Sequence, residues 1–166
     1  MCAIDAPEAV HMTAKEIVLQ ILSDAEQSHL LLRKTQLTKL FYLTEVEYFR
    51  ETGTRLTDIE WLFYRFGPFA FELEMLLDGK DIERISNKTR DGHDVFQYKI
   101  DRASITRKKF VEPSVNSVTR RIVKTWGHKH LKELIDYVYL RTEPMQYAAL
   151  RGDRLDFSTI KSAGTA

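Results

Sequence analysis

The sequence predicts a mainly α-helical fold with a minor α+β component: a compact, single-domain helical bundle that carries one small antiparallel β-hairpin. Three observations lead to this class. Apolar residues recur at helical spacing over most of the chain. Only two short segments have strand-like composition, and a polar connection containing the common turn dipeptide Asp91-Gly92 joins them. A chain of 166 residues with 43% hydrophobic and 30% charged residues suits one globular domain with a sizeable core.

The first two helices are predicted from capping signals and apolar spacing. Thr13 and Glu16 have the spacing of a capping box, which predicts a helix over about 13–27. A second helix is expected from about residue 33 to residue 51, with Gly53 just past its end. Its apolar residues cover more than one face, so we expect other elements to pack on it from several sides.

The next stretch contains the aromatic segment, residues 61–69, which reads Trp-Leu-Phe-Tyr-Arg-Phe-Gly-Pro-Phe. We interpret 56–66 as a helix that ends at Gly67. Pro68 fixes its own φ and disfavours helix for the residue before it, so a short helix over 68–77 is expected to begin at that proline.

Strands are predicted at 82–86 and 95–100, and a basic, irregular stretch follows up to Pro113. Helices are then expected over 114–126, with Ser114 or Ser117 as cap and Gly127 as stop, and over 128–141, with a break at 142–145 where Thr142 is an N-cap.

The expected domain covers residues 13–160. Residues 1–12 show no periodicity and are predicted to be flexible, and residues 161–166 are predicted to be a frayed end.

Several classes of protein are disfavoured by what the sequence contains. Cys2 is the single cysteine, which excludes a disulfide framework within one chain. No apolar run approaches the ~20 residues that span a bilayer, and the N-terminus lacks a signal pattern. We therefore expect a cytoplasmic protein without membrane insertion.

We also expect a protein that is not an enzyme and holds no metal or cofactor. The seven glycines are dispersed and form no phosphate-binding loop, and no serine lies in a nucleophile elbow. His128 and His130 lie two residues apart at a predicted helix start, so they do not face one way and are interpreted as solvated or capping residues.

The basic segment, residues 102–132, holds nine Lys or Arg residues against Glu112 alone, whereas residues 1–101 are net acidic. Cationic helices collect phosphates, so a nucleic-acid contact is one interpretation. Its candidate residues are Arg120, Arg121, Lys124 and Lys129. The preferred interpretation is that this face meets the acidic remainder or water, because the net charge of the whole chain is only +1.

Most side chains of the aromatic segment are expected in the core. Alternating aromatic residues on one short element cannot all face inward, however, and tyrosine and tryptophan dominate binding hot spots. One or two of them are therefore candidates for a patch that faces a partner.

The order of several short motifs resembles the Panacea antitoxin domain, also described as SocA-like. The motifs, spread over about residues 14–157, are Gln36-Leu-Thr-Lys-Leu-Phe-Tyr42, Gly53-x-x-Leu56, the aromatic segment, Glu72-Leu73, the stretch 140–148 and Gly152-Asp-x-Leu-Asp156. One departure is Phe66, where the family has tyrosine directly before Gly-Pro.

The resemblance implies a bacterial or phage protein that acts as the antitoxin of a type II toxin–antitoxin pair. Such a protein binds a cognate protein toxin directly and is not an enzyme. One member type is instead a proteolytic adaptor that delivers its toxin to a Clp protease, and that alternative stays open. The candidate partner-binding residues are Lys39, Tyr42, Tyr64, Arg65, Phe66 and Phe69, and the candidate structural residues of the motif are Trp61, Gly67 and Pro68.

Overall fold

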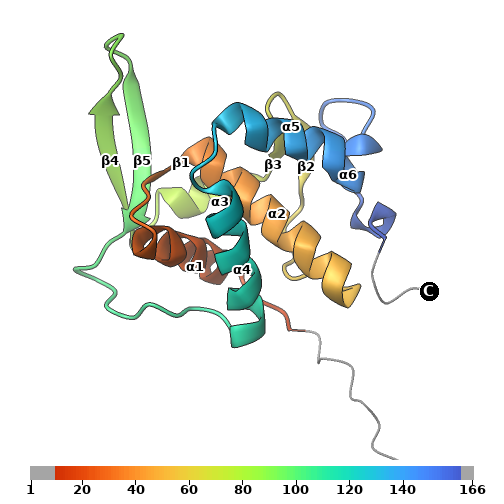
Figure 1. The fold of residues 1–166 in the computed structure, drawn as a ribbon, viewed down its shortest axis with the longest axis horizontal. Coiled ribbons are helices and arrows are strands. Elements are labelled where there is room, and N and C mark those ends of the chain that lie inside the picture. The colour runs from red at the N-terminus through yellow and green to blue at the C-terminus, as the bar shows by residue number, and fades with distance from the viewer. Residues whose placement is uncertain (1–9, 162–166) are drawn as a thin grey trace, which may run out of the picture.

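Helix α2, Lys34–Thr52, is the element on which most others pack in this computed structural model, which describes residues 10–161. It contacts α1, α4, α5 and three of the strands, and Figure 1 shows it running through the middle of the molecule. Every residue from 37 to 46 is buried. The prediction of a central helix is therefore confirmed, as is Gly53 at its end, which has a left-handed φ of 75°.

The other helices cover α2 from different sides. Helices α1 and α4 pack on each other and on α2, while α5 packs on α2 and on α6 (Figure 1). The capping box of Thr13 and Glu16 is present at the start of α1. The bounds are Ala14–Gln27 for α1, Phe71–Leu77 for α3, Pro113–Trp126 for α4, Leu131–Arg141 for α5 and Glu143–Gln146 for α6, with a 3-10 turn at Phe157–Thr159.

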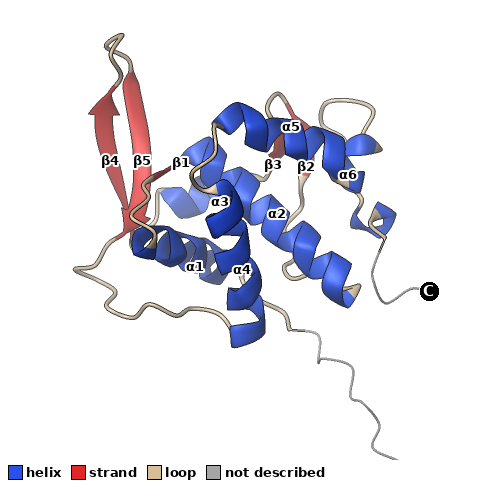
Figure 2. Cartoon of the chain, in the orientation of Figure 1, coloured by secondary structure: helices blue, strands red, loops and turns tan. Residues whose placement is uncertain are grey.

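The predicted hairpin is present and belongs to a three-stranded antiparallel sheet. Strands β4, Ile82–Lys88, and β5, Asp94–Ile100, pair along their full length and extend away from the helices (Figure 2). A third strand, β1 at Leu32–Arg33, pairs with β5 and was not predicted. Two residues are too few to produce a recognisable alternation in a sequence.

Two predictions for the aromatic segment and its neighbours are wrong. The stretch 56–66 is not helical, and no helix begins at Pro68. Strand β2, Leu62–Tyr64, instead pairs antiparallel with β3, Gly67–Phe69, and Arg65 with Phe66 forms the turn between them. Aromatic residues favour strands, and the hairpin leaves Pro68 at a sheet edge, where its missing N–H costs little.

The following helix and the cap of α4 also differ from prediction. Helix α3 begins at Phe71, after Ala70 as N-cap. Helix α4 begins at Pro113 itself, with Glu112 as N-cap in place of a serine. Proline is well suited to a first helical position because its absent N–H has no intrahelical partner there.

The ends of the chain fall only partly within the described residues. The predicted flexible positions 1–9 and frayed positions 162–166 lie outside them. Residues 10–12 contact the domain: the N–H of Met12 donates to the carbonyl of Leu56 at 2.9 Å, and that of Val10 to the Tyr48 hydroxyl at 3.0 Å. Among residues 10–161, no helix is long and apolar enough to cross a membrane.

Glu45, which is fully buried on α2, fixes the start of the aromatic segment. Its carboxylate accepts hydrogen bonds from the backbone N–H of Thr57 at 3.0 Å, from the Thr57 hydroxyl at 2.7 Å and from the indole N–H of Trp61. Arg55 adds an ion pair at 3.2 Å. Burial raises the pKa of the Glu45 carboxyl, and Arg55 and the donors oppose that rise.

The Trp61 ring packs edge to face against Phe41 and Tyr42, with centroids 5.5 Å apart in each case. Trp61 is thus held by its indole N–H and by its ring, and the predicted structural role of this residue fits its place in the core.

Replacing this buried acceptor tests its role. We expect Glu45→Gln to lower the free energy of unfolding by about 2–4 kcal/mol, because one accepting oxygen becomes an amide donor that faces other donors. Glu51→Gln, at an exposed ion pair with Arg121, is the matched control and should cost no more than about 0.5 kcal/mol. Urea unfolding at neutral pH measures both, and equal losses would contradict the assigned role.

Candidate functional site

A pocket of about 330 Å³ lies between the first turns of α2 and the β2–β3 hairpin, and we call it the Lys39 pocket. Helix α2 contributes residues 34, 35, 38 and 39, the hairpin contributes residues 64–69, and α3 contributes Glu74. The pocket therefore brings together two motifs that are 25 residues or more apart in the sequence, one on a helix and one on a hairpin.

Lys39 is buried, with 3% of its surface exposed. Its ammonium donates one hydrogen bond, to the carbonyl oxygen of Pro68 at 3.0 Å. Within residues 10–161 it forms no ion pair with a carboxylate. Burial lowers the pKa of Lys39 to about 8. Keeping this group charged at neutral pH therefore costs stability, which is typical of a functional position.

Gly67 lets the hairpin approach Lys39 closely. Its φ is +98°, a backbone conformation that side chains rarely adopt. A Cβ at this position would lie 3.4 Å from Cε of Lys39 and 3.4 Å from Cε2 of Tyr139. These distances are ordinary van der Waals contacts, so the positive φ is what favours glycine here, and in this conformation the hairpin places the Pro68 carbonyl against the Lys39 ammonium.

Three aromatic side chains, Tyr64, Phe66 and Phe69, form the aromatic rim of the pocket. Tyr64 is 47% exposed and Phe66 is 62% exposed, whereas Phe69 is half-buried. The rings of Tyr64 and Phe69 lie 5.1 Å apart. Exposed aromatic rings grouped beside a pocket are uncommon on surfaces that meet only water.

The exposed apolar surface continues onto α3. Phe71 stacks edge to face on Phe69 at 4.9 Å and is 61% exposed, and Met75, one turn further along α3, is 78% exposed. The aromatic rim, Phe71 and Met75 together form an exposed apolar surface beside the Lys39 pocket.

The charges around the pocket are mainly positive. Lys34 and Glu74 form an ion pair at 2.8 Å, and the Arg65 guanidinium lies over the Phe66 ring at 5.8 Å from its centroid. Glu74 is the one acidic residue that lines the pocket, and it is already paired. The remaining lining charges are Lys39 and Arg65, so the pocket has a net positive charge.

Five of the six residues predicted to bind a partner line this pocket. They are Lys39, Tyr64, Arg65, Phe66 and Phe69. The sixth, Tyr42, is fully buried and its hydroxyl lies 2.8 Å from that of Thr142 in the core. Burial raises the pKa of the Tyr42 phenol. In this structure Tyr42 has no surface to offer a partner, and we remove it from the candidate surface.

Some lining residues were missed in the sequence. Thr35 lies one helical turn before Lys39, and that spacing alone was sufficient to place it on the same face. Helix α3 follows the hairpin directly and so brings Glu74 into the pocket lining and Phe71 and Met75 to the apolar surface beside it. No local pattern in the sequence identifies these three residues.

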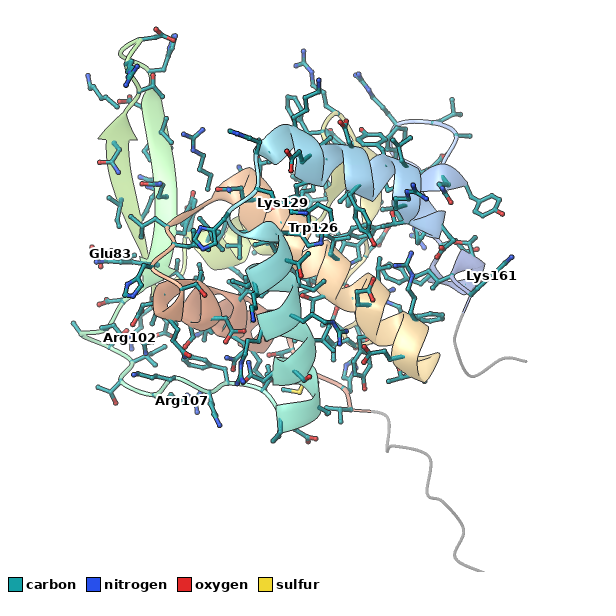
Figure 3. The ribbon with its side chains drawn as sticks, viewed as in Figure 1. Glu83, Arg102, Arg107, Trp126, Lys129 and Lys161 are labelled. Atoms are coloured by element: carbon teal, nitrogen blue, oxygen red, sulfur yellow. The ribbon has the colours of Figure 1, made fainter. Side chains whose placement is uncertain are left out.

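Three of the four cationic residues predicted to contact nucleic acid lie around a different pocket, of about 400 Å³, which we call the basic pocket. Arg120, Arg121 and Lys124 line it together with Lys109, and no acidic residue lines it. The fourth, Lys129, does not: its ammonium lies over the Trp126 ring, 4.5 Å from its centroid (Figure 3). Arg120 donates to the Asn116 side chain at 2.8 Å, which holds its guanidinium at the rim.

No group of three His, Cys, Asp or Glu side chains is arranged to hold a metal ion within the part of the chain that the structure describes.

A comparison with known families identifies one match. The family model described as "Antitoxin SocA-like, Panacea domain" matches residues 37–144, which include Lys39, the β2–β3 hairpin and every lining residue of the basic pocket. No curated protein and no solved structure matches the chain.

The lowered pKa of Lys39 makes a prediction about stability. At pH 7 we expect Lys39→Met to raise the free energy of unfolding by about 1–3 kcal/mol, because the buried charge is removed and the aliphatic stem is kept. The folded pKa of about 8 lies below the ordinary value of 10.5, so the native lysine gains stability as the pH rises between these two values.

The advantage of the variant should therefore be full below pH 8 and shrink towards pH 10.5. Urea unfolding at a series of pH values measures it, with Lys124→Met, at an exposed lysine, as the control. A difference between Lys39→Met and the native protein that does not change with pH would contradict the burial effect.

Proposed function

This chain belongs to the Panacea family of SocA-like antitoxins, and from that premise we propose that it neutralises a toxin protein by binding it directly, as the antitoxin of a type II pair. The observation that supports direct binding is the Lys39 pocket with its aromatic rim. Residues from the helix motif and from the aromatic segment, which carry the family resemblance, converge there.

The chemistry of this surface suits a protein partner. Tyrosine and other large rings dominate binding hot spots because they cover much area with few rotatable bonds. Tyr64 and Phe66 supply such rings at an exposed hairpin tip, and Phe71 and Met75 enlarge the apolar area. A partner that covers the rim would remove these side chains from water, a gain of about 25 cal/mol for each Å² of apolar surface buried.

We also propose that the chain acts by binding and not by catalysis. Several polar groups of the pocket form contacts within the fold. The Thr38 hydroxyl donates to the carbonyl of Lys34 at 2.8 Å, the Lys39 ammonium donates to Pro68, and Glu74 is paired with Lys34. Groups held in this way are suited to present a fixed surface.

Co-expression with the neighbouring open reading frame tests the antitoxin function. We expect that neighbour to arrest growth when expressed alone, and to co-purify with this chain when both are expressed. If the neighbour is harmless alone and does not co-purify, the proposal fails. The half-life of the neighbour's product, with and without this chain, distinguishes neutralisation by binding from delivery to a Clp protease.

The aromatic rim should be required for neutralisation. We expect Phe66→Ala to weaken toxin binding by about tenfold or more while leaving the melting temperature nearly unchanged, because the side chain is exposed in the free protein. Tyr147→Ala is the matched control: its ring is 72% exposed but lies outside the Lys39 pocket. Affinity is measured by calorimetry and neutralisation by colony counts, and equal effects of the two variants would contradict the assignment.

A second candidate function is nucleic-acid binding at the basic pocket, for which the gathering of Lys109, Arg120, Arg121 and Lys124 is the supporting observation. If these side chains contact phosphates, affinity for duplex DNA should fall steeply as salt rises. The double variant Lys109→Gln, Lys124→Gln should reduce the slope of log affinity against log salt by about 2. A shift assay measures it, and absence of retention at low salt removes this candidate.

A further inference from the structure

The Lys39 ammonium has unused hydrogen-bonding capacity. A lysine ammonium has three donors, and the structure assigns one of them, to the carbonyl of Pro68. A buried charge is normally compensated by an opposite charge or by several hydrogen bonds. Lys39 lines an open pocket, so the missing compensation can come from a molecule that enters it.

The groups around the pocket favour an anion. Lys34, Arg65 and Glu74 are the other charged residues that line it, and Glu74 is held by Lys34 at 2.8 Å. The phenol of Tyr64 is at the rim, and the ring of Tyr139 packs beside Gly67. No lining residue supplies a free carboxylate to Lys39. A carboxylate that enters the pocket could therefore pair with the Lys39 ammonium without displacing another carboxylate.

The hydrogen-bond donor of this pocket is a side chain and not a set of backbone N–H groups, which favours an acidic side chain over a C-terminal carboxylate as the ligand. Carboxyl termini are generally captured by several backbone N–H groups in a nest. In this pocket residues 62–64 and 67–69 of the hairpin pair with each other, the turn between them is only two residues long, and the buried donor is the Lys39 side chain. The aromatic rim lies next to it and accommodates an apolar residue adjacent to the acid.

We propose that the Lys39 pocket binds the side-chain carboxylate of an acidic residue in a toxin segment, while an apolar neighbour of that residue lies on the aromatic rim. The inference rests on the proposed function, since it names the chemistry by which the toxin is recognised. It predicts an ion pair in the complex that includes at least one of the two unassigned N–H groups of Lys39.

Blocked tripeptides test the pocket without the toxin. The probes are leucine-glutamate-leucine and leucine-glutamine-leucine, both acetylated and amidated, and the glutamine peptide with a free carboxyl end. Titrations followed by amide NMR should move the signals of Gly67 and Phe69, and the glutamate peptide should bind at least about tenfold more tightly than the blocked glutamine peptide. The free-end peptide should resemble the blocked glutamine peptide.

Variants connect this preference to Lys39. Lys39→Met, which removes the ammonium, should abolish the preference for glutamate over glutamine. Lys124→Met, at the basic pocket, should preserve that preference. Raising the pH from about 7 to about 9.5 should weaken the glutamate peptide roughly tenfold, because free Lys39 loses its proton over this interval, and should leave the glutamine peptide unchanged.

Three results would overturn the proposal: equal binding of the two blocked peptides, a glutamate preference that survives in Lys39→Met, or tighter binding of the peptide with the free carboxyl end. These are distinguishable from failure of the antitoxin function. If the toxin is neutralised but no peptide preference is found, only this inference fails; if the preference is found but no toxin co-purifies, only the antitoxin function fails.

Discussion

Two charged side chains of the central helix, Glu45 and Lys39, hold the aromatic segment at its two ends. Glu45 receives the indole N–H of Trp61 and both donors of Thr57, and Lys39 donates to the carbonyl of Pro68. Both are buried on α2, where an uncompensated charge is costly. The hydrogen bonds that these two side chains form with the aromatic segment therefore determine where the hairpin lies, and most of the candidate surface depends on that position.

The hairpin cannot bury its tip because both of its ends are held against α2. Side chains alternate across a strand, so Phe63 packs against Tyr139 with centroids 6.2 Å apart while Tyr64 turns outward. Arg65 and Phe66 form the turn and have no layer above them. Trp61, Gly67 and Pro68 are thus buried, whereas Tyr64 and Phe66 are exposed and available for contact.

The uneven charge of the chain has two outcomes in the structure. Part of the basic segment meets the acidic remainder: Arg102 pairs with Glu26 at 3.1 Å, and Arg121 pairs with Glu51. The expectation that the basic segment meets the acidic remainder of the chain therefore holds for Arg102 and Arg121. Lys109, Arg120 and Lys124 gather instead at the basic pocket, which no acidic residue lines. The basic pocket and the Lys39 pocket share no lining residue.

The sequence by itself determined the helices with strong local signals, such as the capping box of α1 and the glycine after α2, and the β4–β5 hairpin. It also identified, through the ordered motifs, the family and five residues of the Lys39 pocket. The capping box, the terminal glycine, the β4–β5 hairpin and each single motif depend on residues near one another in the chain. Only the tertiary structure decided that 62–69 is a hairpin and not a helix, that Tyr42 is buried and that Lys39 is a buried donor. The places of Lys39 and Tyr42 depend on contacts between α2 and residues 29 and 100 positions away, which no local pattern contains.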